Sequence, residues 1–140
     1  MAIPKHISLE FVTPERAIVH DDVDEVELPG EEGYFGVLPG HAPLLAALKV
    51  GEMWYRKGTE KHFAFVGDGF AEVLPDRVSV LAQVAERADT IDIQRAEASK
   101  RRAEERLTKP TTEIDFERAR IALLRALTRL QVSRHTRPRA

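Results

Sequence analysis

Apolar and polar side chains alternate along the chain from Ile7 to Val84. Ile7, Leu9 and Phe11 alternate with polar neighbours, and the same period of two returns in several later segments. Successive side chains of a β-strand point to opposite faces, so this period predicts strands with one buried face. Turn residues separate the segments at Thr13-Pro14, Gly51, Lys57-Gly58, Gly67-Asp68-Gly69 and Pro75-Asp76. Such a pattern is typical of a β-sandwich or barrel, and we expect about eight to ten strands.

The stretch from Pro29 to Leu48 breaks this alternation. It contains four glycines and three prolines in twenty residues. Glycine gives access to positive φ, whereas proline fixes φ and removes a backbone donor. We therefore expect an irregular, shaped loop between apolar strands. A loop that is held on a rigid sheet is a contact surface by default.

After Glu86 the apolar residues follow a helical period. The expected apolar seam of residues 92 to 107 consists of Ile93, Ala96, Ala103 and Leu107. This spacing predicts an amphipathic helix with a thin seam rich in alanine. Thr90 is the expected N-cap, and Asp92 in the first turn suits the positive end of the helix dipole.

A second helix is predicted after Pro110, because proline cannot continue the first. Thr112 is its expected N-cap, with Asp115 at the third position of a short capping box. Its expected seam consists of Phe116, Ala119, Leu123, Ala126 or Leu127, and Leu130. Two antiparallel helices with a short connection make a hairpin. Burying alanine contributes far less than the ~1.5 to 3 kcal/mol of a buried leucine or phenylalanine, so we expect a marginal hairpin, loosely docked and able to move.

These patterns predict an α+β chain in two parts: a β-sandwich over residues 1–88, and an antiparallel two-helix hairpin with a frayed basic tail over residues 89–140. The two parts differ in charge. Residues 1–88 hold eight Lys and Arg against fifteen Asp and Glu, a net −7, and residues 89–140 hold thirteen against eight, a net +5, which gives −2 for the chain. Eleven of the thirteen basic residues in the second part are arginine. The guanidinium group pairs with carboxylates and phosphates.

The composition excludes several classes of protein. The chain has no cysteine, which excludes a disulfide framework and a thiolate metal site and fits a reducing compartment. No run approaches the ~20 apolar residues of a membrane-spanning helix, and the first residues lack the long apolar core of a leader peptide. We expect association with a membrane only indirectly, through a partner.

No group of residues has the pattern of a catalytic site. The five histidines are scattered without the spacing of a zinc site. The glycines of the stretch from Pro29 to Leu48 lack the Gly-Lys-Ser/Thr ending of a phosphate-binding loop. We expect neither enzymatic activity nor a metal site. His41 has two interpretations: its imidazole ties its own loop to a backbone carbonyl, or it contacts a partner.

Arginines recur on both predicted helices. Arg95 and Arg102 share one face of the first helix, and Arg118, Arg125 and Arg129 form a comparable row on the second. Folding the hairpin can bring the two rows together. One interpretation is an anion site for nucleotide phosphates or for an acidic partner surface. The other is a solvated basic face, supported by glutamates one helical turn away.

The segment from Gly33 to Leu44, Gly-Tyr-Phe-Gly-Val-Leu-Pro-Gly-His-Ala-Pro-Leu, resembles the signature of the epsilon subunit of bacterial F-type ATP synthases. The likeness extends through residues 67–73 and 91–96 and covers nearly the whole chain. It implies a non-catalytic rotor subunit that couples proton-driven rotation to ATP synthesis. Its sandwich would lie between the gamma subunit and the c-subunit ring, on the cytoplasmic face of the bacterial inner (plasma) membrane. The c-ring contact residues implied are Glu31, Glu32, Gly33, Tyr34, Pro39, Gly40, His41 and Ala42. Tyr34 departs from relatives that carry an acidic residue at that position.

The segment Ile91-Asp-Ile-Gln-Arg-Ala96 matches the motif of bacterial members that bind ATP. The ATP-binding residues that the resemblance implies are Glu86, Ile91, Asp92, Arg95, Ala96, Arg102, Arg125 and Arg129. No cofactor is required, and ATP is the expected regulatory ligand. The hairpin would hold ATP when folded onto the sandwich. When extended along gamma, it would meet the catalytic beta subunits and block hydrolysis, so low ATP would favour inhibition.

Two other functions stay open on the sequence alone. One is a structural connector that never changes shape. The other is a nucleic-acid-binding adaptor whose arginines track phosphates. The acidic sandwich and the absence of stacking aromatic residues from the hairpin argue against the adaptor, so we expect no nucleic-acid partner.

Overall fold

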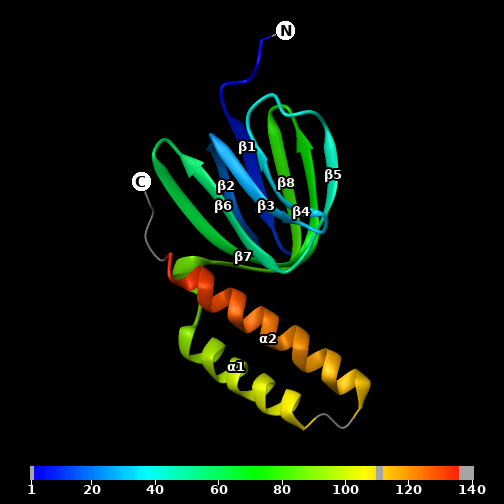
Figure 1. Ribbon diagram of the computed structural model, residues 1–140. Coiled ribbons are helices and arrows are strands. Elements are labelled where there is room, and N and C mark those ends of the chain that lie inside the picture. Colours follow the sequence, from blue (N-terminus) through cyan, green and yellow to red (C-terminus); the bar gives the residue numbers. More distant parts are fainter. Residues whose placement is uncertain (1, 110–111, 136–140) are drawn as a thin grey trace.

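The structure, a computed structural model, describes residues 2–109 and 112–135. Eight strands precede a single turn of 3-10 helix and two α-helices (Figure 1). The elements are β1 (Ile7–Val12), β2 (Ala17–Val23), β3 (Glu25–Gly30), β4 (Gly33–Val37), β5 (Leu44–Leu48), β6 (Gly51–Lys57), β7 (Glu60–Leu74), β8 (Arg77–Arg87), η1 (Ala88–Thr90), α1 (Ile93–Thr108) and α2 (Glu113–Ser133). The predicted fold class and the predicted strand number are confirmed.

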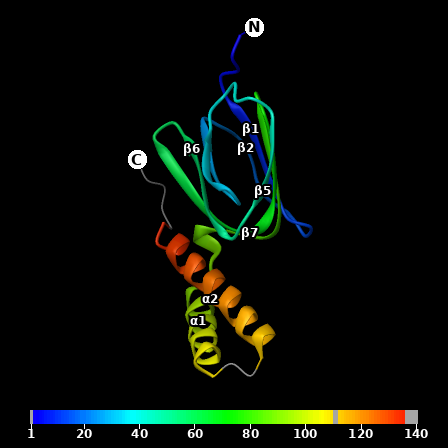
Figure 2. The same cartoon turned by 45° about the vertical axis from the view of Figure 1, so that its right-hand side comes forward.

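The strands form two layers that share the long strand β7. Strands β2, β1, β8 and β5 form one layer with the second half of β7, where Leu44–Leu48 pairs with residues 69–73. Strand β8 also pairs with part of the first half of β7, because its pairing runs over residues 64–74. Strands β4, β3 and β6 form the other layer, joined to the first half of β7, where Gly51–Lys57 pairs with residues 60–66. Figure 2 shows the two layers face to face, with the helices below them.

Strand β7 passes from one layer to the other at Asp68 and Gly69. Asp68 has a φ of 69° and Gly69 a φ of 158°. A Cβ atom on Gly69 would lie 2.1 Å from the carbonyl oxygen of Leu81 on β8. Only glycine allows this close approach of two backbones. The bend therefore depends on Gly69, and it presents Asp68 toward the hairpin.

The sandwich core consists of large side chains that are shielded from solvent. Phe11, Leu28, Met53 and Val80 are each 0% exposed. They come from β1, β3, β6 and β8, so both layers contribute to one core. The alternation predicted from Ile7 onward is observed directly, because Ile7, Leu9 and Phe11 are the buried residues of β1.

The expectation of one irregular loop from Pro29 to Leu48 is wrong. Strand β3 continues to Gly30, and β4 and β5 both lie inside the stretch. Gly30 and Gly36 adopt extended backbone conformations and pair with Gly33 and Glu27 across the β3–β4 hairpin. Glycine permits positive φ but does not require it, so its density alone does not exclude a strand. Irregular backbone is confined to the turn between β3 and β4 and to residues 38–43.

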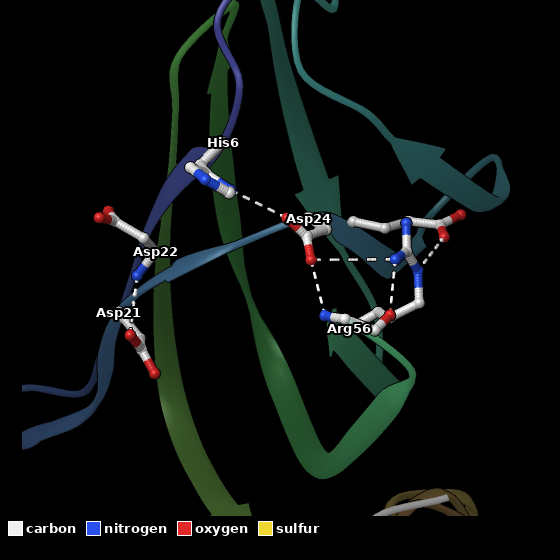
Figure 3. A network of polar contacts seen from close by, with 7 residues as sticks. His6, Asp21, Asp22, Asp24 and Arg56 are labelled. Carbon is white, nitrogen blue, oxygen red and sulfur yellow. Dashed lines mark hydrogen bonds and ion pairs between the residues drawn. The ribbon is translucent and has the colours of Figure 1, made fainter. Parts of the chain in front are cut away.

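A network of charged side chains ties the corner after β2 to the β6–β7 hairpin (Figure 3). The Asp24 carboxylate accepts the backbone N–H of Gly58 at 2.7 Å and lies 2.9 Å from Nδ1 of His6. These contacts, the Gly58 N–H first, lower the pKa of Asp24 below its ordinary value. Arg56 adds an ion pair to Glu25 at 3.1 Å. The network closes a corner far from the helices, and we assign it a structural role.

Both helices begin at a side-chain cap. Asp92 caps α1 by accepting the N–H of Arg95 at 3.0 Å, whereas the hydroxyl of Thr90 donates to the carbonyl of Arg87. The expectation that Thr90 is the N-cap is therefore wrong, because η1 occupies residues 88–90 before α1 begins. Thr112 caps α2 by accepting the N–H of Asp115 at 3.0 Å, as predicted.

The two helices pack against each other through alanine. The buried seam residues are Ala96 and Ala103 on α1 and Ala119 and Ala126 on α2. Two larger residues expected in the seams lie outside them, since Ile93 is 48% and Phe116 40% exposed. Small side chains allow the two backbones to approach closely, and this approach leaves no room for isoleucine or phenylalanine between them.

The apolar contact between the hairpin and the sandwich lies at the C-terminal end of α2. Val132, near the C-terminal end of α2, is 0% exposed and packs in a small cluster with Phe65, Ala88 and Ile91. The ring of His135 stacks on Phe63, with the ring centroids 3.9 Å apart. In both views the other end of the hairpin, where α1 and α2 connect, projects away from the strands (Figures 1 and 2).

Candidate functional site

A cavity of about 530 Å³ lies where the sandwich meets the hairpin. Residues from both parts line it: Glu86 from β8, Asp92 at the start of α1, Arg95 and Ala96 on α1, and Arg129 on α2. These five are among the residues predicted to bind a nucleotide. The cap at Asp92 fixes the direction of α1, so Arg95, Ala96 and Ser99 face the cavity from its first two turns.

One wall of the cavity is held by an ion pair between the two parts. Nε of Arg129 donates to the Glu86 carboxylate at 2.9 Å, and both side chains are about three-quarters buried. The guanidinium carbon of Arg129 also lies 4.5 Å from the centre of the Phe65 ring, which adds a cation–π contact. Arg129 is therefore already fixed at the cavity wall without a ligand.

Three of the predicted nucleotide-binding residues do not line the cavity. Ile91 is buried in the small cluster around Val132. Arg102 lies further along α1, where its guanidinium donates to Oγ of Ser99 at 3.1 Å. Arg125 forms an ion pair with Asp68 at the bend of β7, at 3.4 Å. The arginines of the two helices thus do not form a single cluster; each has its own surroundings.

On the sandwich side of the cavity, the sequence predicted only Glu86. Thr13, Glu15 and Arg16, in the turn between β1 and β2, line it together with Gln83 on β8. The sequence signal for this turn was Thr13-Pro14, which marked only the end of a strand. The sequence alone does not predict that this turn lies near residues of α1 some eighty positions later. Their proximity depends on the parallel pairing of β1 with β8.

The residues predicted to touch a ring of c subunits fall into two separate places. Glu31 and Glu32 lie in the turn before β4, and Gly33 and Tyr34 are the first residues of that strand. The N–H of Glu31 donates to the carbonyl of Ala47. Pro39, Gly40, His41 and Ala42 lie beyond the other end, where the N–H of Gly40 donates to the carbonyl of Pro75. Strand β4 runs from Gly33 to Val37, so Gly33 and Tyr34 are its first residues, and the rest of the strand lies between the two segments.

His41 is bound to its own loop. Its Nδ1 lies 2.6 Å from the carbonyl oxygen of Ala42, so the imidazole N–H donates to the backbone. The first of the two interpretations of His41 is confirmed. Tyr34 is 54% exposed, and its hydroxyl accepts the N–H of Glu52 at 3.3 Å. The phenol therefore ties β4 to β6 while part of its ring stays open to solvent.

An apolar face lies on the outside of β5, β7 and β8. Leu45, Phe70 and Leu81 are 73%, 56% and 58% exposed, and Phe70 is paired with Leu81 across the two strands. A second cavity of about 510 Å³ adjoins this face and is lined by Phe70, Leu81 and Glu31 among others. Large exposed apolar residues grouped on one sheet mark a surface that another molecule covers.

No helix within the described residues is both long enough and apolar enough to cross a membrane.

A β-sandwich followed by a helical hairpin, with a charged cavity between them, defines the class of protein. Two family models match the chain in succession. Residues 6–88 match the model described as "ATP synthase, Delta/Epsilon chain, beta-sandwich domain", and residues 89–134 match "ATP synthase, Delta/Epsilon chain, long alpha-helix domain". The chain therefore belongs to the delta/epsilon family of ATP synthase subunits.

Curated relatives within this family are epsilon chains. The chain is similar to the "ATP synthase epsilon chain" of Nitratidesulfovibrio vulgaris, with 48% identity over 128 residues, 91% of this chain and 96% of the relative. It is 49% identical to that of Syntrophobacter fumaroxidans over 130 residues, 93% of this chain and 97% of the relative.

Among solved structures, the fold is similar to a chain of the Euglena gracilis mitochondrial ATP synthase (OSCP/F1/c-ring). The TM-score is 0.83 at 23% identity, over 96% of this chain and 85% of that chain.

Proposed function

We propose that the chain is a non-catalytic rotor subunit in the central stalk of an F-type ATP synthase, and that its hairpin inhibits ATP hydrolysis under the control of ATP. The cavity shared by the sandwich and the hairpin carries this proposal. Membership of the delta/epsilon family supports the assignment to an ATP synthase complex. Similar folds occur in solved assemblies titled OSCP/F1/c-ring and central stalk/cring. In that setting the subunit couples proton-driven rotation of the c ring to ATP synthesis.

The cavity has the size and the side chains that ATP requires. Its volume of about 530 Å³ lies within the range of small-molecule sites. Arg95 and Arg129 match the charge and geometry of phosphate oxygens. The Asp92 and Glu86 carboxylates accept hydrogen bonds from ribose hydroxyls or from the adenine amino group. Arg129 is paired with Glu86 in the structure. A bound phosphate group would replace the Glu86 carboxylate as the anionic partner of Arg129.

The position of the cavity explains how ATP would control the hairpin. Its lining comes from both parts of the chain, so ATP binds more tightly when the hairpin is docked than when it has swung away. A ligand shifts a conformational equilibrium only through such a difference in affinity. At low ATP the hairpin extends along gamma, and α2 contacts the catalytic beta subunits and blocks hydrolysis.

The sandwich offers separate surfaces for its neighbours in the stalk. The apolar face formed by Leu45, Phe70 and Leu81 is our candidate for the contact with gamma. The turn at Glu31–Tyr34 and the segment at Pro39–Ala42 are two candidate contacts with the c ring. The subunit then lies at the cytoplasmic face of the plasma membrane and is held there by the complex.

The inhibitory role is tested in the purified native complex by measuring ATP hydrolysis with and without residues 89–140. A rise in hydrolysis on truncation supports the inhibitory hairpin. An unchanged rate refutes it and leaves the hairpin as a fixed connector.

The sensor role is tested by titrating ATP against the isolated chain. Arg129→Ala is expected to weaken ATP binding by about tenfold or more, because it removes a charge-assisted hydrogen bond at the cavity. Arg125→Ala should weaken it less, since Arg125 pairs with Asp68 outside the cavity. Arg118→Ala is the matched control and should have no effect. Absence of saturable binding up to millimolar ATP removes the sensor role without affecting the rotor role.

A further inference from the structure

The turn between β1 and β2 forms part of the cavity but belongs to the sandwich. Arg16 stands on this turn, facing a cavity whose other wall carries Arg95 of α1. A second hollow of about 220 Å³ is lined by Arg16, Thr90 and Arg87. The side chain of Arg16 therefore borders both hollows at the junction of the sandwich and the hairpin.

Hydrogen bonds fix the backbone that carries Arg16. The N–H of Thr13 donates to the carbonyl of Arg16 at 2.9 Å. The hydroxyl of Thr13 donates to the same carbonyl at 3.2 Å and accepts the N–H of Arg16 at 3.3 Å. A turn closed in this way presents its side chains from a fixed base. The backbone of Arg16 is thus fixed at the edge of the cavity.

The charges at the cavity wall are unevenly compensated. Of the arginines that line it, Arg129 is neutralised by Glu86. Among the described residues, the side chains of Arg16 and Arg95 have no carboxylate within ion-pair distance. An anion that enters the cavity therefore meets two guanidinium groups that lack a direct carboxylate partner, one from each part of the chain, beside the carboxylates of Glu15 and Asp92 that also line it.

We infer that Arg16 is a phosphate-binding residue of this cavity and that a polyphosphate held between Arg16 and Arg95 clamps the hairpin to the sandwich. The inference rests on the proposed ATP site and deepens it, because it adds a phosphate-binding residue from the sandwich to a site in which Glu86 of β8 is the other sandwich residue with an assigned role. A guanidinium group binds phosphate oxygens through two parallel hydrogen bonds. Because the polyphosphate contacts both the sandwich and the hairpin, the docked state binds it more tightly than the extended state does. This difference in affinity couples ligand binding to docking of the hairpin, as regulation requires.

The binding test uses the isolated full-length chain and calorimetric titration with ATP and with inorganic tripolyphosphate. Arg16→Ala is expected to weaken both ligands by about tenfold, and Arg16→Lys by less, since the charge remains. The matched control is Arg101→Ala, an exposed arginine on α1 outside the cavity. It should not weaken binding, because Arg101 does not line the site.

The coupling is measured by energy transfer between dyes on Thr59→Cys in the sandwich and Lys109→Cys at the far end of the hairpin, since the natural chain has no cysteine. ATP should stabilise the docked distance in the wild type and lose this effect in Arg16→Ala. If wild type binds ATP and Arg16→Ala binds it equally well, the inference is wrong while the ATP site stands. If wild type binds neither ATP nor tripolyphosphate, the proposed sensor and this inference both fall. Thermal unfolding of Arg16→Ala checks that the variant is folded.

Discussion

The sandwich and the hairpin bury different kinds of side chain. The sandwich encloses Phe11, Leu28 and Met53 without solvent exposure, whereas the helices meet through alanines such as Ala103 and Ala119. Hydrophobic stabilisation scales with the apolar area that is removed from water. Each buried position in the hairpin therefore contributes far less than its counterpart in the sandwich.

The comparison teaches that one chain combines a stable platform with an element of low local stability. Several larger apolar residues of α2, among them Ile121, Leu124 and Leu127, stay exposed when the hairpin is docked. Few buried contacts join α2 to the strands, and most of them lie around Val132. Elements that move are drawn from the regions of low local stability. The predictions below separate the two regions by changing one at a time.

The largest effect is expected from emptying the sandwich core. Phe11→Ala should destabilise the folded chain by about 3 to 5 kcal/mol, because it removes a fully buried ring and leaves a cavity between the layers. Urea unfolding followed by the fluorescence of Trp54 measures the loss. Phe70→Ala on the exposed face is the control and should cost much less. Equal losses from the two variants would contradict the assignment of the core.

A smaller effect, confined to the hairpin, is expected from enlarging its seam. Ala103→Leu should destabilise the packing of α1 on α2 by about 1 to 3 kcal/mol, since the helices must separate to admit the larger side chain. Hydrogen exchange should accelerate for the amides of both helices and stay unchanged in β1 and β8. Gln94→Leu adds the same side chain at an exposed position of α1 and serves as the control. Faster exchange throughout the sandwich would mean that the two regions unfold as one.

The sequence predicted the elements well and the contacts between them poorly. Alternation at Ile7, Leu9 and Phe11 identifies a strand, because a period of two reports the local backbone directly. The predicted helix seams contain the four buried alanines, which is confirmed, but also Ile93 and Phe116, which are exposed. Helical periodicity defines an apolar face without fixing which residues of that face lie at the line of closest approach.

The candidate site shows the same limit. Glu86, Asp92, Arg95, Ala96 and Arg129 were named in advance by resemblance to a motif, and they meet at one cavity. Arg125 and Arg102 were named on the same basis and lie outside it. Arg16 was not named, because its place depends on a parallel pairing of β1 and β8 that joins residues about seventy positions apart.

A third variant tests how the hairpin is attached. Val132→Ala should weaken docking by about 1.5 kcal/mol, because it removes two buried carbon atoms from the cluster with Phe65 and Ile91. The distance between dyes on the two parts should lengthen in the absence of ATP, while the unfolding of the sandwich stays near that of wild type. Leu124→Ala, at a partly exposed position of α2, is the control. An unchanged distance in Val132→Ala would show that the ion pairs Arg129–Glu86 and Arg125–Asp68 suffice for docking.

The smallest effect concerns a carboxyl group under the end of α2. The side chain of Glu52 on β6 is 15% exposed and lies 3.7 Å from Nε2 of His135. Burial, and then the negative charge of Glu27, raise the pKa of Glu52 above its ordinary value. A raised pKa in the folded chain means that the protonated carboxyl suits this place better than the carboxylate does. The stability that Glu52 contributes is therefore complete below its unfolded pKa of about 4.3 and is lost as the pH rises through its folded pKa.

Glu52→Gln removes this ionisation and keeps the shape of the side chain. At pH 8 it should stabilise the docked chain by less than about 1 kcal/mol, since a buried carboxylate is replaced by a neutral amide. The gain should shrink as the pH falls toward 5, because Glu52 then takes up its proton. Thermal unfolding of the two proteins across this pH range measures the difference, with Glu60→Gln on the exposed β6–β7 hairpin as the control. A gain that is largest at pH 5 would reverse the sign and would mean that the ionised Glu52 is a favourable partner of the helix end. In that case the hairpin is attached more firmly at neutral pH than its alanine seam implies.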